Sequence, residues 1–86
     1  MNFAHLAANG ASTIGATNQG IKLHTVAVNT KGATGNTLTL AQGSTTIAII
    51  DTTAGPAYWL YDIDLTGPLT ATLATGTAAD VTISYQ

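Results

Sequence analysis

The stretch "PAYWLYDIDL", residues 56–65, alternates two kinds of side chain. Successive side chains of an extended strand point to opposite faces, so every second residue shares a face. One face collects large apolar side chains, which we interpret as a core row with Trp59 as a packing anchor. The residues of this row are Trp59, Tyr61, Ile63 and Leu65. The stretch therefore predicts a strand over residues 57–65 with one buried side.

The opposite face of the same strand places an apolar pair, Tyr58 and Leu60, beside an acidic pair, Asp62 and Asp64. An outward apolar patch with a polar rim is typical of a protein interface. We predict that this face, together with part of the N-terminal segment, contacts another subunit. The interface candidates are Tyr58, Leu60, Asp62, Asp64, Phe3, His5 and Leu6.

Asp62 and Asp64 are also the best candidates for holding a cation. Two carboxylates at i and i+2 of a strand lie about 6 to 7 Å apart, and Asp80 or loop carbonyls could complete a calcium shell. Calcium requires six or more oxygens, however, and no DxDxDG loop supplies them. Two acids on one face more often keep that face hydrated, so we predict no metal and no cofactor.

The rest of the chain predicts strands as well. Threonine, valine and isoleucine favour a pleated strand, and turn residues recur every 8 to 12 positions, as in sandwiches and barrels. Segments such as "LTATLAT" and "VTISY" alternate apolar and polar residues, which indicates antiparallel strands with one buried side. The expected strands are residues 12–17, 20–30, 36–42, 45–51, 57–65, 69–75 and 79–85. We expect one all-β domain over residues 1–86, an antiparallel sandwich of about 7–8 short strands with jelly-roll or immunoglobulin-like order.

Two segments are less regular. Residues 3–8 could form a short helical turn or an arm, and we assign residues 1–11 as an N-terminal arm. In "IKLHTVAVNT", residues 21–30, Ile21, Leu23 and Ala27 occupy one face while Val26 and Val28 occupy the other. Neither face of that strand is clearly polar, so we expect both faces to be covered, with the strand in a central position under the arm or against a neighbouring subunit.

Charge excludes several classes of function. The chain has two lysines, no arginine, four aspartates and no glutamate. Binding to nucleic acid or to an anionic membrane requires several cations, so we expect neither. A weakly charged, cysteine-free chain with a thin core is also a poor isolated monomer, and assembly is a common remedy.

No catalytic constellation stands out. A nucleophile with a base could use only His5 or His24 with an aspartate and a hydroxyl, and no GxSxG, HExxH or phosphate-loop motif specifies one. We expect His24 to be a hydrogen-bonded strand residue and His5 a terminal or interface residue. Because no such motif is present, we predict that the protein is not an enzyme.

The N-terminus lacks the basic region and the apolar run of a signal peptide, so we expect no cleaved secretion signal.

The motifs V-N-T, G-A-T-G, T-L-T, I-A-x-I-D-T, Y-D-x-D-L and G-T-A-A-D-V-T-x-x-Y occur in this order between residues 22 and 85. In these motifs the chain resembles small β-sandwich virion proteins of tailed bacteriophages, of the capsid decoration or auxiliary type. The resemblance implies a virion component that is assembled in the host cytoplasm and binds the major capsid protein or another virion protein. It implies no catalytic residue.

We thus expect a capsid decoration or cement protein that stabilises the assembled head and is a homo-oligomer, a trimer if it occupies local threefold axes. A tail or fibre-attachment component is the first alternative, because it would share both composition and source. A carbohydrate-binding β-sandwich module is the second, and it requires exposed, coplanar aromatic side chains near a groove.

Overall fold

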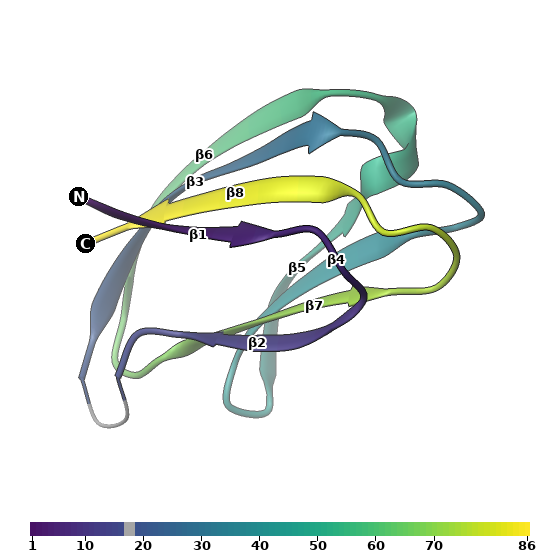
Figure 1. Ribbon diagram of the computed structural model, residues 1–86. Coiled ribbons are helices and arrows are strands. Elements are labelled where there is room, and N and C mark those ends of the chain that lie inside the picture. The colour runs from purple at the N-terminus through teal and green to yellow at the C-terminus, as the bar shows by residue number, and fades with distance from the viewer. Residues whose placement is uncertain (17–18) are drawn as a thin grey trace.

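The computed structural model describes residues 1–16 and 19–86 and contains two four-stranded antiparallel sheets packed face to face (Figure 1). One sheet has the strand order β1-β8-β3-β6 and the other the order β2-β7-β4-β5. The strands are β1 (Asn2–Leu6), β2 (Gly10–Ile14), β3 (Ile21–Thr30), β4 (Thr37–Gln42), β5 (Thr45–Asp51), β6 (Ala57–Leu65), β7 (Leu69–Ala74) and β8 (Asp80–Tyr85). A single 3-10 turn, η1 (Thr52–Ala54), links β5 to β6. The predicted all-β sandwich is confirmed.

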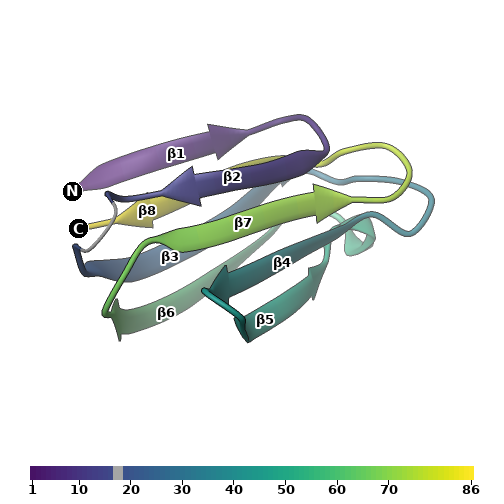
Figure 2. The same ribbon diagram turned by 90° about the horizontal axis from the view of Figure 1, so that it is seen from below.

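The strand order is that of a jelly roll. Strand β1 pairs with β8, β2 with β7, β3 with β6 and β4 with β5, as if one long hairpin had been folded over on itself. Both termini consequently lie at the same end of the molecule (Figure 1). Figure 2 shows the second sheet in front of the first, with β2, β7, β4 and β5 side by side. Of the two predicted orders, the structure has the jelly roll and not the immunoglobulin-like arrangement.

The core lies between the sheets and consists of the alternating apolar residues of each strand. Leu38, Leu40, Leu69, Leu73 and Ile83 are fully buried in it. On β6 the side chains of Trp59, Tyr61 and Ile63 pack against this core while remaining half-exposed at the open side of the sandwich, and Leu65 is buried. The core row expected on β6 therefore faces inward.

The apolar pattern of β3 has a different explanation from the one expected. The pairing of β3 with both neighbours shifts between Leu23 and Thr25, so a β-bulge interrupts the strand there. An extra residue reverses the faces of the strand beyond it. Ile21 and Leu23 before the bulge, and Val26 and Val28 after it, are consequently all buried in one core. The expectation that something covers two apolar faces of this strand was wrong.

The N-terminal segment also differs from expectation. Residues 2–6 are extended and form the edge strand β1, with Phe3 opposite Ser84 and His5 opposite Thr82 on β8. The side chains of Ala4 and Leu6 pack against the core. Strand β2 begins at Gly10, two residues before the strand expected over residues 12–17, and Thr17 lies outside the described residues. The arm assigned to residues 1–11 is thus part of the sandwich, because β8 offers it a ladder of backbone partners.

At the end of the sandwich away from the termini, the loops meet at the fully buried side chain of Asn36. Its amide nitrogen donates to Asn9 Oδ1 and to the carbonyl oxygens of Ala74 and Thr75, at 3.0, 3.1 and 2.9 Å. Its amide oxygen accepts from Thr52 Oγ1 at 2.7 Å and from the Ala79 N–H at 3.2 Å. Gly32 passes so close that a Cβ there would lie 2.7 Å from both the Asn36 side chain and Thr52 Oγ1. This polar hub was not predicted from the sequence.

Candidate interaction surface

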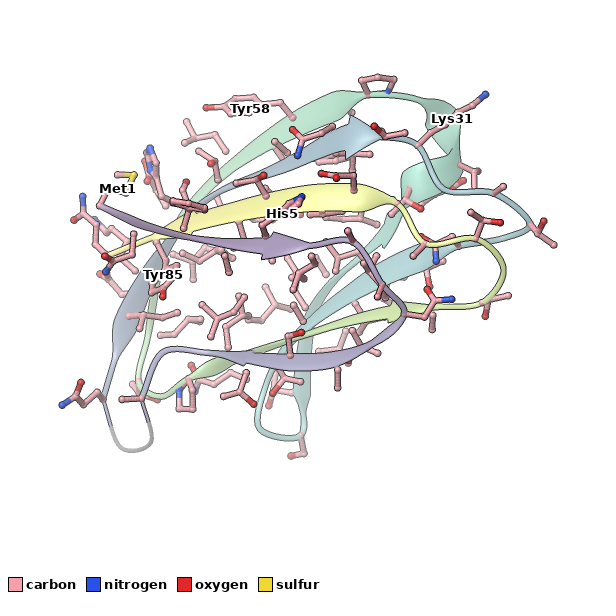
Figure 3. All side chains as sticks on the ribbon, in the orientation of Figure 1. Met1, His5, Lys31, Tyr58 and Tyr85 are labelled. Atoms are coloured by element: carbon pink, nitrogen blue, oxygen red, sulfur yellow. The ribbon has the colours of Figure 1, made fainter. Side chains whose placement is uncertain are left out.

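The side of the β1-β8-β3-β6 sheet that faces away from the core, called here the outer face, gathers most of the predicted interface residues. Phe3, Tyr58 and Leu60 are 72%, 64% and 59% exposed. Figure 3 shows Tyr58 projecting away from the sandwich above β6. Tyr58 and Leu60 share one face of β6 and form a contiguous apolar pair, and exposed apolar side chains that adjoin one another indicate a contact site. Two segments more than 50 residues apart in sequence thus contribute to one face.

The strand register arranges these residues in two rows across the sheet. In the first row Phe3 lies opposite Ser84, Ser84 opposite Thr25, and Thr25 opposite Leu60. The second row is His5, Thr82, Ala27 and Tyr58. Only small side chains occupy the two central strands in these rows, while the large ones stand on the edge strands β1 and β6. At a strand spacing of about 4.8 Å, roughly 14 Å separates the two edges.

On this face, one histidine–aspartate hydrogen bond links each edge strand to its neighbour. His5 Nε2 on β1 lies 2.8 Å from Asp80 Oδ1 on β8, and His24 Nδ1 on β3 lies 2.5 Å from Asp62 Oδ1 on β6. Because a carboxylate only accepts, the imidazole nitrogen donates in each pair. Both pairs are exposed, so each contributes little to stability, but together they orient the edge strands that carry the apolar side chains.

Asp80 is the most heavily engaged acid of the outer face. The Asn29 amide donates to its carboxylate at 2.9 Å and also to Thr82 Oγ1 at 2.9 Å. The Asn29 hydrogen bond, followed by that of His5, lowers the pKa of Asp80 below its ordinary value. Asp80 therefore stays ionised on this face well into the acid range.

The structure also places the candidate cation ligands. Asp62 is bonded to His24 and Asp64 lies opposite Lys22, while Asp80 belongs to β8, which β3 separates from β6. A metal ion bound by all three carboxylates would need ligands from both sides of β3. Within residues 1–16 and 19–86, no group of three or more histidine, cysteine or acidic side chains is placed to hold a metal ion.

The hydroxyls near the histidines have other partners. Thr25 and Ser84, which lie opposite each other on β3 and β8, hydrogen-bond to one another. A pocket of about 240 Å³ lies at the corner between β1 and β2 and is lined by residues 5–12. The lining is one continuous segment, in which His5 and Leu6 are followed by small and polar residues. It contains no aromatic platform of the kind that a sugar-binding groove requires.

Sequence reasoning found the apolar residues of this surface but missed both histidine–aspartate pairs. His5 and Asp80 are separated by 75 residues and His24 and Asp62 by 38, so only the strand pairing brings them together. The position of Leu6 also differs from that of the other six candidates, because its side chain packs against the core instead of lying on the outer face.

Comparison with known proteins adds no assignment: no protein-family model matches the sequence, and no curated protein matches it significantly. None of the helical structure in the described residues is long and apolar enough to cross a membrane.

Proposed function

We propose that this protein is a non-enzymatic structural component of a bacteriophage particle, a decoration protein that binds the assembled head. The observation that carries this proposal is the exposure of Phe3, Tyr58 and Leu60 on the outer face, beside aspartates that already accept hydrogen bonds from histidines. A surface of this composition suits contact with another protein, because its apolar residues gain from burial and the carboxylates of Asp62 and Asp80 already have hydrogen-bond donors. The proposed partner, the major capsid protein or a neighbouring virion protein, rests on the resemblance of the sequence motifs to small virion proteins.

Such a protein would act by mass action. A ligand that binds only the assembled shell stabilises it relative to free subunits, in proportion to the logarithm of the ligand concentration over the dissociation constant. The low net charge of −2 limits repulsion between the many copies on one particle. The protein would be made in the host cytoplasm and retained in the virion.

The test uses heads of the phage whose genome carries this sequence, prepared with the corresponding gene deleted. Purified protein should co-sediment with these heads at a fixed number of copies per capsomer and should raise their melting temperature. Phe3→Ser should weaken binding by about tenfold or more, because it removes an apolar anchor that makes little contact with the fold. Phe3→Tyr should retain most of the affinity.

Ile49→Ser is the matched control, since Ile49 is 67% exposed but lies on β5 of the other sheet. Equal loss of binding in both serine variants would place the contact elsewhere. Failure of the wild-type protein to bind heads, or its localisation on tails by cryo-electron microscopy, would overturn the proposal. A tail location would favour the fibre-attachment role.

The carbohydrate-binding alternative lacks a supporting observation of this kind. Its natural platform, Trp59, lies on the inner side of β6 and packs against the core. Of the aromatic residues on the outer face, Phe3 and Tyr58 stand on opposite edge strands. A glycan titration followed by Trp59 fluorescence should therefore leave the emission unchanged.

A further inference from the structure

Strand β6 forms the longest of the four sheet edges. It spans nine residues, against seven for β5 and five each for β1 and β2. As the last strand of its sheet, β6 pairs only with β3, so alternate backbone N–H and C=O groups of its extended residues before Asp62 point away from the sheet. An open edge of this kind is a template for a further strand.

The side chains along this edge are apolar on both faces of the sheet as far as Tyr61. Tyr58 and Leu60 are exposed on the outer face, while Trp59 and Tyr61 remain half-exposed at the open side of the sandwich. The acids Asp62 and Asp64 follow, and the sequence from Thr45 to Leu65 contains no lysine, arginine or histidine. A partner strand must therefore supply apolar side chains near residues 58–61 and must keep its own acids away from these two.

We propose that the occupant of this edge is the β6 strand of a second copy of the chain, paired antiparallel about a twofold axis at Leu60. Residues directly opposite each other in an antiparallel pair have their side chains on the same face of the sheet. The core faces of the two copies therefore lie on the same side of the joined sheet only when the residue at the axis lies opposite its own copy. An axis at Asp62 or Ile63 would bring aspartates directly opposite one another. These registers are excluded by like-charge repulsion.

The register centred on Leu60 is self-complementary. It places Leu60 opposite its own copy and Trp59 opposite the second copy's Tyr61, which gives two aromatic cross-strand pairs related by the axis. Regular pairing in this register covers residues 59–61 of each copy and ends before Asp62, whose φ of 50° departs from the extended conformation of a strand. An axis at Tyr61 would instead set Asp62 against Leu60. An axis at Trp59 would set Asp62 against Pro56, which has no N–H to donate.

The resulting dimer would have one continuous eight-stranded sheet built from two β1-β8-β3-β6 sheets. The contact is isologous, so the assembly closes at two copies and differs from the trimer considered for threefold axes. Tyr58 and Leu60 would lie at the centre of the joined outer face and Phe3 near its two ends. The inference does not require the head-binding role, because edge pairing concerns the free protein in solution.

The first test is the mass of the purified protein by light scattering during size-exclusion chromatography. The wild type should have twice the 8.7 kDa mass of the chain. Leu60→Lys should be monomeric, because it sets two ammonium groups against each other on the axis. Phe3→Lys and Ile49→Lys add the same charge at equally exposed positions away from β6 and should remain dimeric, and circular dichroism should show that all three variants are folded. A monomeric wild type, or a dimer that survives Leu60→Lys, would overturn the proposal.

Cysteine probes test the register, since the natural chain contains no cysteine. Leu60→Cys should form an intermolecular disulfide rapidly under mild oxidation, because directly opposed Cβ atoms lie about 4.5 to 5.5 Å apart. Tyr58→Cys should cross-link at least tenfold more slowly, because its copy would lie four residues along the partner strand. Equal rates in the two variants would contradict a pairing centred on Leu60.

Discussion

Asn36 is the residue on which one end of the sandwich depends. Its side chain is buried and bonds to five residues in three segments: the β1–β2 turn, η1, and the end of β7 with the β7–β8 loop. Polar side chains are rarely buried without full satisfaction, and a satisfied one specifies a single arrangement of its neighbours. The loops at this end are thus positioned by one amide.

Asn36→Asp should lower the free energy of unfolding by about 3 kcal/mol or more at neutral pH. The carboxylate would replace the donor that now faces three oxygens, and burial of a charge beside carbonyls is costly. Urea denaturation measures the change. Asn2→Asp, an exposed substitution on β1, should stay within about 0.5 kcal/mol of the wild type. An Asn36→Asp variant as stable as this control would contradict the assigned role.

Acid sensitivity should arise from Asp80 and Asp51. Hydrogen bonds from Asn29 and His5 lower the pKa of Asp80, and those from the Thr53 hydroxyl and backbone N–H lower the pKa of Asp51, each from an ordinary 3.8. A carboxylate with a lowered folded-state pKa stabilises the fold above its unfolded-state pKa. That stabilisation is lost as the pH falls through 3.8 towards the folded-state value.

Melting temperatures recorded between about pH 6 and pH 2 should therefore fall at the acid end for the wild type. The double variant Asp51→Asn, Asp80→Asn should show a flatter profile, because neither position then titrates. Thr53→Ala, which removes one donor to Asp51, should flatten it partly. Parallel profiles for the wild type and the double variant would show that other groups control the acid transition.

At the scale of the element, the bulge in β3 decides which residues enter the core. Val26 is fully buried whereas Ala27, its neighbour, lies on the outer face between Thr82 and Tyr58. A regular strand beginning at Ile21 and Leu23 would have placed Ala27 inside and Val26 outside. Opposite this point, β6 is irregular as well: Asp62 has a φ of 50°, and its carboxylate accepts a hydrogen bond from the imidazole of His24.

Val26→Asp should prevent stable folding, because it buries a carboxylate among aliphatic side chains and costs several kcal/mol. Ala27→Asp should fold with a melting temperature within a few degrees of the wild type, since the new carboxylate reaches solvent. Far-ultraviolet circular dichroism with thermal melting compares the two. The reverse ranking would mean that β3 continues without a bulge.

At the scale of the whole molecule, the jelly-roll order leaves four strand edges and joins distant segments across each sheet. An edge strand exposes unpaired backbone N–H and C=O groups, which proteins shorten, cover or pair. Strand β1 closes the open side of β8 in this way, and the proposed pairing of β6 would close the other edge of the same sheet.

If folding and pairing of β6 are coupled, the melting temperature should rise with protein concentration by about 4 °C per tenfold increase. Differential scanning fluorimetry over a hundredfold range measures the slope. Leu60→Lys should melt at a temperature independent of concentration, whereas Ile49→Lys should keep the slope of the wild type. A wild-type curve without any concentration dependence would argue against coupling.

The sequence by itself determined the fold class, most of the strand positions and the facing of β6, because alternation along a strand is a local property with a period of two residues. It also identified Tyr58 and Leu60 as outward apolar residues for the same reason. The tertiary structure alone decided the bulge in β3, the assignment of residues 2–6 to an edge strand and the partners of His5, His24 and Asn36. These features depend on which strands pair and in which register, and pairing between segments 38 to 75 residues apart leaves no periodic trace in one sequence.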